Sequence, residues 1–311
     1  MSVYTAVNQQ QLKNFLSHYS LGGLVDFSGI HAGIDNSNYA VETSQGKFIL
    51  TIFETLTIEE IPCYLSLLNH LGEQEFPSPI PQSATNKSFI HTLQNKPAAL
   101  FNCLPGSSIE APSINQCTEV GEYLAKLHLL SKNTNFQQAN PKDINGCQSI
   151  FERISPYLSQ DEITLLGSEL NYQLNVSLPN IPQGIIHADL FKDNVLFQQE
   201  QMTGMLDFYN ACTDYYIFDI AVACNDWCAD GAMINQKKLA AFLSGYNKVR
   251  TLSTDEIDCL NIFLRRAALR FCLSRLDHQF FPKEGELTLS KDPGVFRHLL
   301  EYHIFSAGAA A

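Results

Sequence analysis

Residues 24–54 alternate between apolar and polar side chains in the manner of β-strands. Tyr39, Val41 and Thr43 stand at every second position of one run and Phe48, Leu50 and Ile52 at every second position of the next, and Gln45-Gly46 lies between them. A period of two indicates a half-buried strand, and a short turn with glycine between two such runs is typical of a β-hairpin. The pattern therefore predicts an antiparallel hairpin in this part of the chain.

Other parts of the first hundred residues complete a small sheet. Apolar residues at helical spacing around 12–19 predict a short first helix, and Thr57 with Glu60 fits a capping box that begins a helix ending near Leu71. Two further strand-like runs, 89–93 and 98–103, flank a polar turn. These elements predict a sheet with one helix inserted after its third strand.

The pattern changes to helices from about residue 113. Apolar faces predict one helix around 120–127, one or two within 150–173, and a long one that starts at Ser253 and reaches about Arg275. Residues 184–209 are a strand-rich exception within this half. We therefore expect an α+β fold with two lobes, a small antiparallel β lobe over 1–103 and a larger, mainly helical lobe over 104–311.

Composition is consistent with this picture and excludes several classes of partner. The 311 residues are 45% hydrophobic and 17% charged, with a formal net charge of -12. Nucleic acids and anionic membranes bind concentrated Lys and Arg, so neither is an expected partner. Nine scattered cysteines indicate a reducing compartment, and with no basic, apolar N-terminal leader the expected location is the cytoplasm.

The most informative stretch is a polar loop between two apolar strands. Residues 184–197 read G-I-I-H-A-D-L-F-K-D-N-V-L-F, and a second strand ends in Asp207 ten residues after Phe197. This arrangement resembles the H-x-D-x-x-x-x-N catalytic loop of the aminoglycoside phosphotransferase and choline kinase group, which shares its fold with protein kinases. The resemblance implies a protein-kinase-like fold and ATP with Mg²⁺ as cofactors.

Phosphoryl transfer to an alcohol explains the spacing of this loop. The reaction needs a carboxylate that orients the hydroxyl and accepts its proton, and metal ions that neutralise the phosphates. The resemblance implies that Asp189 is the base and that His187 belongs to the catalytic loop, where it holds the backbone. Asn194 and Asp207 would supply the oxygen ligands that Mg²⁺ prefers.

The nucleotide-binding side departs from the protein-kinase pattern. The turn at 29–38 is rich in small polar residues that can present N–H groups to phosphates, and the expected contacts there are Gly33, Asn36, Ser37 and Asn38. The connector near 101–104 would place Asn102 and Leu104 against adenine by resemblance only. Thr51 stands where the family's phosphate-binding lysine is expected.

Several segments together resemble the homoserine kinases of this fold. They include 33–39, 50–54, 96–100 and 186–191, and the resemblance spans about residues 24–300. It implies transfer of the γ-phosphate of ATP to the side-chain hydroxyl of L-homoserine, which gives O-phospho-L-homoserine for threonine biosynthesis. The alternatives are a kinase of another small alcohol (choline, ethanolamine, an aminoglycoside or a methylthio-sugar) and an inactive nucleotide-binding member of the fold.

A cluster of arginines on the long helix also favours an anionic group on the substrate. Four of them lie within eleven residues: Arg265, Arg266, Arg270 and Arg275. Homoserine needs a cation for its α-carboxylate, whereas choline and aminoglycosides need the opposite. The predicted substrate contacts are Arg270, Arg266 one turn earlier and Tyr209. The alternative is that the arginines pair with acidic neighbours such as Asp258 and Asp277.

Overall fold

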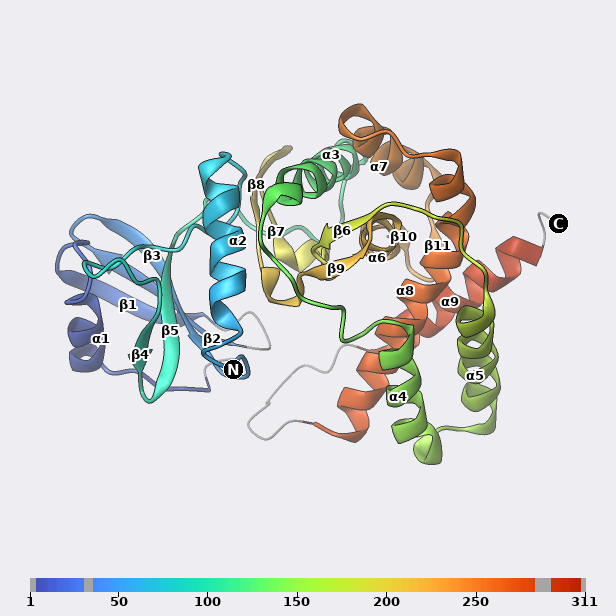
Figure 1. Cartoon of the computed structure of the whole chain (residues 1–311), viewed down its shortest axis with the longest axis horizontal. Helices are drawn as coiled ribbons and strands as arrows, with labels where there is room; N and C mark the ends of the chain where they lie inside the picture. The colour runs from blue at the N-terminus through green and yellow to red at the C-terminus, as the bar shows by residue number, and fades with distance from the viewer. Residues whose placement is uncertain (1–3, 31–35, 283–291, 309–311) are drawn as a thin grey trace. The chain divides into compact units, whose positions relative to one another are not determined.

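A computed structural model describes residues 4–30, 36–282 and 292–308 (Figure 1). By their internal contacts, the described residues form two compact units, the first from residues 4–30, 36–105 and 134–136 and the second from Gly106–Asn133, Gln137–Pro282 and the C-terminal helix. The fold is mixed α+β, as expected. No helix within the described ranges has both the length and the apolarity to cross a bilayer.

The first unit is built on a five-stranded antiparallel sheet in the order β1-β2-β3-β5-β4. Its strands are β1 (Leu24–Ile30), β2 (Asn36–Thr43), β3 (Gly46–Phe53), β4 (His91–Leu93) and β5 (Lys96–Asn102). The predicted hairpin is present, with Thr43 opposite Gly46. At the β4–β5 turn, Gln94 and Asn95 both have positive φ, which suits a tight hairpin turn.

Opposite faces of this sheet carry different layers. Residues paired across antiparallel strands project to the same side. One side, with Leu50 and Leu100, packs with Leu12 and Phe15 of α1 (Gln9–Leu16) in a single apolar cluster. This cluster contains the apolar residues of the predicted first helix and fixes which strand positions face away from it.

The helix inserted after β3 begins later than predicted. Helix α2 spans Ile61–Glu73 and its N-cap is Glu60, not Thr57. Glu60 still accepts a hydrogen bond from the Thr57 backbone N–H at 2.8 Å, so half of the capping box is present. The wrong start has a local cause, because Pro62 suits the first turn of a helix and places the helix start next to itself.

Helices dominate the second unit. They are α3 (Ile114–Leu130), α4 (Ile144–Ile154), α5 (Gln160–Asn175), α6 (Tyr216–Trp227), α7 (Gln236–Val249), α8 (Thr254–Phe280) and α9 (Pro293–Gly308). Ser253 and Glu256 form the predicted capping box of α8. The strand pairs are β6 (Gln183–Ile186) with β9 (Cys212–Tyr215), β7 (Val195–Gln198) with β8 (Gln201–Met205), and β10 (Ala229–Asp230) with β11 (Met233–Ile234).

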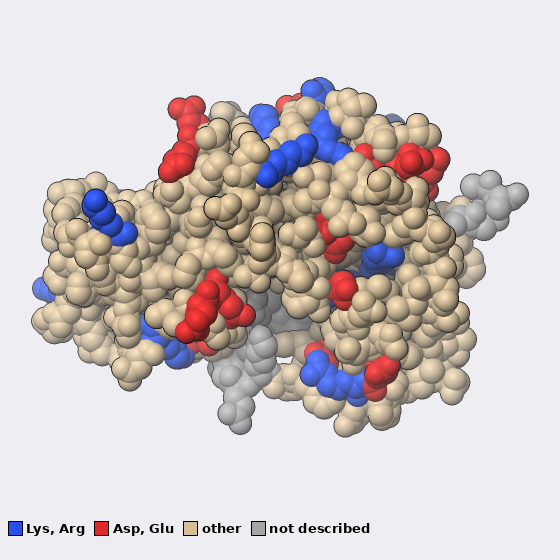
Figure 2. Space-filling view, viewed as in Figure 1, with Lys and Arg blue, Asp and Glu red and all other residues tan. Residues whose placement is uncertain are grey.

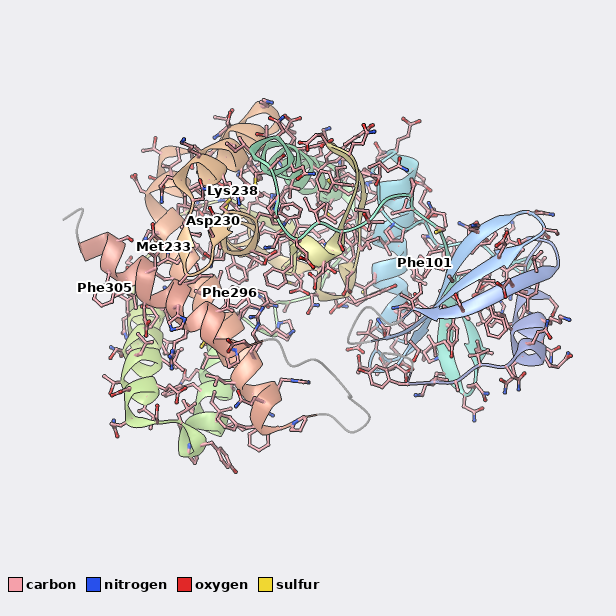
Figure 3. All side chains as sticks on the ribbon, turned by 180° about the vertical axis from the view of Figure 1, so that it is seen from behind. Phe101, Asp230, Met233, Lys238, Phe296 and Phe305 are labelled. Carbon is pink, nitrogen blue, oxygen red and sulfur yellow. The ribbon has the colours of Figure 1, made fainter. Side chains whose placement is uncertain are left out.

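Packing of α9 on α8 uses aromatic rings and one buried histidine. Phe296 of α9 (Figure 3) stacks on Phe271 of α8 with ring centroids 5.2 Å apart. Elsewhere in this unit, Lys238 of α7 donates a hydrogen bond to Asp230 of β10 at 2.7 Å (Figure 3). His303 Nε2 lies 2.8 Å from Asn225 Oδ1 of α6. Burial, with a smaller effect of Arg265, lowers the pKa of His303 to about 4.

This buried histidine makes stability depend on pH. The pKa of His303 is lower in the folded state than the ordinary value near 6.5, so unfolding takes up a proton between these values and stability is lost as pH falls through that window. The contribution is about 3 kcal/mol at most. We expect His303→Gln, which keeps a donor for Asn225, to lose less stability than wild type between pH 7 and pH 4.5.

Urea unfolding followed by the fluorescence of Trp227, the chain's one tryptophan, measures this difference. Equal losses in free energy of unfolding for both proteins would contradict the assignment of the effect to His303.

Candidate active site

The H-x-D-x-x-x-x-N loop lies directly after β6, and a buried carboxylate holds it in place. Asp219 of α6 is fully buried, and its two oxygens accept hydrogen bonds from the backbone N–H groups of His187 (2.7 Å) and Ala188 (2.8 Å). Ala188 has φ 63°, a conformation that costs a residue with a side chain free energy. The two hydrogen bonds to Asp219 stabilise this strained backbone.

Asp219 has a third partner that the sequence did not indicate. His128 of α3 lies with Nε2 3.0 Å from Asp219, and its Nδ1 lies 2.7 Å from the hydroxyl of Tyr246. Burial would raise the pKa of Asp219, but the hydrogen bonds from His128 and His187 lower it overall. Burial lowers the pKa of His128. A neutral His128 that donates a hydrogen bond to an ionised Asp219 agrees with the lowered pKa of each residue.

The chain of hydrogen bonds continues away from the loop to the start of α8. Arg250 donates to the hydroxyl of Tyr246 at 3.2 Å and to Glu256 at 2.8 Å. Glu256, whose side chain is 1% exposed, also caps α8 through the N–H of Ser253 at 3.0 Å. Every donor in this series therefore has an acceptor, which is the condition for a buried polar network to be stable.

His187 lies between the loop and the strand end that carries Asp207. Its Nε2 is 2.8 Å from the carbonyl oxygen of Leu206, and its Nδ1 is 3.3 Å from the backbone N of Asp189. The ring is thus engaged on both nitrogens with main-chain groups. This geometry allows His187 to position Asp189 relative to the end of β8.

The two predicted metal ligands are brought together by the β7–β8 hairpin. The N–H of Leu206 donates to the carbonyl of Asn194 at 2.8 Å, so Asp207 follows directly next to Asn194. The amide nitrogen of Asn194 donates to the carbonyl of Asp189 at 2.8 Å, which turns its Oδ1 away from that bond. Asp207 has φ 60°. The backbones of Asn194 and Asp207 thus lie next to each other, and the side chain of Asn194 is also hydrogen-bonded to Asp189.

The predicted substrate contacts fall into different surroundings. Arg270 is 2% exposed, and its Nε and Nη1 atoms have no hydrogen-bond partner in the part of the chain that the structure describes. Burial lowers its pKa, and the strongest opposing effect comes from Asp189. Arg266 donates to Gln173 at 3.0 Å. Tyr209 lies in the short helical turn Phe208–Asn210 just after Asp207.

The other arginines of α8 have protein partners, but not the ones considered from the sequence. Arg265 pairs with the buried carboxylate of Glu169, and Arg275 donates to the carbonyl of Asp292 at 2.8 Å. Asp277 is paired with Arg153 of α4. The alternative of structural ion pairs therefore holds for Arg265, while Arg270 differs from it in having unpartnered nitrogens.

On the first unit, the predicted nucleotide contacts belong to β2 and to the end of β5. Ser37 is fully buried, and its hydroxyl donates a hydrogen bond to the carboxylate of Glu54 and accepts one from the backbone N–H of Thr5. Asn36 accepts from the N–H of Glu54 at 3.3 Å, and Asn38 accepts from Thr51 at 2.7 Å. The side chain of Ser37 therefore has a structural use. Gly33 lies outside the described residues.

Thr51 occupies the position of the expected lysine, and a different lysine lies nearby in the sheet. Lys96 of β5 pairs with Glu54, just after β3, and donates to Thr5 at 3.0 Å. Ile52 pairs with Ala98, so Glu54 and Lys96 project to the side of the α1 cluster, whereas Thr51 projects to the other side. Lys96 is thus part of a partly buried polar network on the α1 side of the sheet.

In the connector, the side chain of Asn102 is also used internally. The side-chain oxygen of Asn102 accepts a hydrogen bond from the backbone N–H of Ile80. The backbone N–H of Asn102 donates to the carbonyl oxygen of Ile80 at 3.1 Å. The backbone N–H of Cys103 donates to the carbonyl oxygen of Lys47 at 3.3 Å. Leu104, which follows, is partly exposed. Any contact with a base in this segment would therefore come from the main chain.

Comparison with known proteins agrees with this geometry. The model of the phosphotransferase enzyme family (APH) matches residues 26–252. Curated homoserine kinases of Methylobacillus flagellatus and Neisseria meningitidis are 38% and 42% identical, over 98% and 96% of this chain and 96% and 99% of those proteins. The chain belongs to the homoserine kinases of this phosphotransferase family.

Solved structures agree on the fold of this kinase family. An amicoumacin kinase in complex with AMP-PNP, Ca²⁺ and Ami superposes with a TM-score of 0.74 at 14% identity, over 96% of this chain and 94% of that one. A microcompartment-associated aminopropanol kinase gives 0.64 at 17% identity, over 97% and 96%. The predicted protein-kinase-like fold is confirmed.

Proposed function

We propose that this chain catalyses the ATP-dependent phosphorylation of the side-chain hydroxyl of L-homoserine to O-phospho-L-homoserine, a step toward threonine. The observation that carries the choice of substrate is Arg270, a buried guanidinium with unpartnered nitrogens, and the charged group that most stabilises its protonated form is the proposed base Asp189. A buried charge without hydrogen bonds is costly, so a ligand that supplies acceptors there is stabilised. The identity with curated homoserine kinases supports the same substrate.

Asp189 is the proposed base in this reaction. It follows the strained Ala188, whose backbone is fixed by Asp219, and its own backbone N lies 3.3 Å from His187. The carboxylate orients the acceptor hydroxyl toward the γ-phosphorus of ATP and takes its proton as the new O–P bond forms and ADP leaves. His187 positions this loop through both of its ring nitrogens.

Asn194 and Asp207 are the residues that fit a magnesium ion. Mg²⁺ is usually bound by one or two protein carboxylates or other oxygens together with phosphates and water, so two hard donors suffice. The described residues hold no cluster of three or more His, Cys, Asp or Glu side chains, which agrees with a site completed by ATP. The ion would neutralise charge on the transferred phosphoryl group.

The first unit is the proposed nucleotide-binding part. Support comes from the start of β2, where Asn36 accepts from the N–H of Glu54 and Asn38 from the hydroxyl of Thr51, directly after the polar turn predicted from the sequence. Gly33 in that predicted turn remains a predicted contact. Backbone N–H groups of such a turn bind phosphates. In the connector, Asn102 is the structural residue and Leu104 the proposed main-chain contact for adenine.

The substrate carboxylate is proposed to bind Arg270, with Arg266 one turn earlier on α8 and Tyr209 at the end of the β8 segment. A guanidinium binds a planar carboxylate through two parallel hydrogen bonds, and Arg270 has unpartnered Nε and Nη1 atoms. A cationic acceptor such as choline would meet a like charge here. The alternative alcohols of this class are therefore disfavoured.

The base assignment is tested by Asp189→Asn. The amide keeps the shape but removes the proton acceptor, so kcat with homoserine should fall about 10²- to 10⁴-fold. The matched control is Asp193→Asn, which removes an exposed carboxylate from the same loop. ADP release measured at saturating ATP and homoserine decides the matter, and turnover near wild type in Asp189→Asn would exclude Asp189 as the base.

The metal assignment is tested by Asp207→Ala. We expect most turnover to be lost while the fold remains, because Asp207 is partly exposed and outside the apolar core. Thermal unfolding gives a second readout, since Mg²⁺ with a non-hydrolysable ATP analogue should raise the Tm of wild type more than that of the variant. An unchanged dependence of activity and Tm on Mg²⁺ would contradict this role.

Substrate recognition is tested by Arg270→Met. Loss of a charge-assisted contact should raise the KM for homoserine about 10- to 100-fold and leave the KM for ATP nearly unchanged. Because the free protein loses a buried unpaired charge, its Tm should stay equal or increase. Homoserine amide should be a poor substrate of wild type and comparatively less impaired in the variant.

A structural role for Arg270 predicts the reverse. The variant would then be unstable, with a normal KM for homoserine.

A further inference from the structure

A cavity of about 390 Å³ lies within the second unit, next to the antiparallel strands β6 and β9. Strand β6 leads into the catalytic loop. Its wall contains Asp214 on β9, Arg266 on α8, and Lys142 with Asp143 just before α4. In Figure 2, acidic and basic side chains lie close together over the region of β9, α4 and α8. A hollow with both signs of charge suits a small zwitterion better than an ion of one sign.

Two of the four charged side chains of the cavity already have structural tasks. Asp143 caps α4, accepting from the N–H of Gly146 at 2.8 Å. Lys142 donates to the side chain of Asn210 at 3.1 Å. Arg266 and Asp214 are the remaining pair of opposite charge.

Asp214 and Arg266 influence each other's charge but take their hydrogen bonds from other groups. Asp214 accepts one from the amide of Asn140 and one from the N–H of Tyr215, both at 2.7 Å. Each carboxylate oxygen has room for a second donor. Arg266 donates through Nε to Gln173, so its terminal nitrogens are left for a ligand.

Protonation of the pair is consistent with a partly dehydrated site. Burial raises the pKa of Asp214, while Asn140, Tyr215 and Arg266 oppose that rise. Burial lowers the pKa of Arg266, and Asp214 gives the strongest opposing effect. A cationic ligand group beside Asp214 and an anionic one beside Arg266 would each stabilise the charged form of the residue that it contacts.

The spacing of the two elements matches the length of the substrate. Arg266 precedes Arg270 by four residues, about 6 Å along the helix. Asp214 is two residues beyond Cys212, about 7 Å along the strand, and Cys212 pairs with Ile186, the last residue of β6 before the catalytic loop. Extended homoserine spans about 5 Å from its hydroxyl oxygen to its carboxylate carbon.

The cavity wall thus lies one turn along α8 from Arg270 and two residues along β9 from the Ile186–Cys212 pair, which favours this cavity for the α-carbon end of a homoserine whose hydroxyl is at Asp189. Arg266 and Arg270 are four residues apart on α8 and project from the same face of the helix. The carboxylate then lies between the two arginines, and the ammonium group, attached to the next carbon, faces β9.

We propose that Asp214 binds the α-ammonium group of the acceptor and thereby selects an amino acid among small primary alcohols. This inference rests on the proposed function and extends it, because the carboxylate contact alone would accept any ω-hydroxy acid. Asn140 acts as the positioning residue, since its amide holds one oxygen of the Asp214 carboxylate at 2.7 Å.

The test compares homoserine with 4-hydroxybutyrate, which has the hydroxyl and the carboxylate but lacks the ammonium group. Wild type should prefer homoserine by about 10- to 100-fold in kcat/KM, the range of one charge-assisted hydrogen bond. Asp214→Asn should lose most of this preference through a higher KM for homoserine, with little change for 4-hydroxybutyrate. Asn140→Ala should shift the same ratio in the same direction, but less.

The matched control is Asp258→Asn, which removes an exposed carboxylate from α8 and should leave the ratio unchanged. An equal loss of activity on both substrates, or a full preference for homoserine in Asp214→Asn, would overturn the inference. Absence of homoserine turnover in wild type would instead contradict the proposed function. In that case, calorimetric titration of homoserine without ATP decides on Asp214, since equal Kd values for wild type and Asp214→Asn would exclude it.

Discussion

The hydrogen bonds of one buried carboxylate are the constraint on which this site depends. Asp219 accepts from two successive backbone N–H groups of the catalytic loop and from His128. Ala188 adopts a left-handed conformation that a residue with a side chain disfavours, and such strain persists only where the surroundings fix it. The loop can therefore aim Asp189 because α6 supplies an ionised, fully hydrogen-bonded partner.

The same network also fixes the position of the long helix that carries the proposed substrate contacts. Hydrogen bonds connect Asp219 through His128, Tyr246 and Arg250 to Glu256 in the first turn of α8. Arg270 is fourteen residues farther along, about 21 Å on a straight helix. A packed helix is rigid, so anchoring its first turn also fixes the positions of residues farther along it. The same buried hydrogen bonds therefore help to position both the catalytic loop and the arginines of α8.

Local signals in the sequence predicted most elements correctly, although the Thr57 and Glu60 capping box placed the start of α2 too early. The hairpin around Gln45-Gly46, the Ser253 capping box and the Asp189 to Asn194 spacing each need only neighbouring residues, and the fold followed from them. His128 could not be found in this way, because its partner Asp219 is 91 residues away. The side chains of Ser37 and Asn102 resemble ligand contacts in the sequence, yet tertiary packing commits both to internal hydrogen bonds.

An acidic protein that binds an anionic nucleotide and a zwitterion must recognise them at short range. With a formal net charge of -12, its long-range field repels anions, and salt screens that field within about 10 Å. Recognition therefore depends on contacts inside desolvated sites, where a buried guanidinium such as Arg270 interacts strongly. The cost of burying Arg270 lowers the stability of the free protein, and in the proposed complex the acceptor carboxylate would offset this cost. If Arg270 binds the acceptor as proposed, selectivity for the acceptor and reduced stability of the free enzyme have the same physical origin.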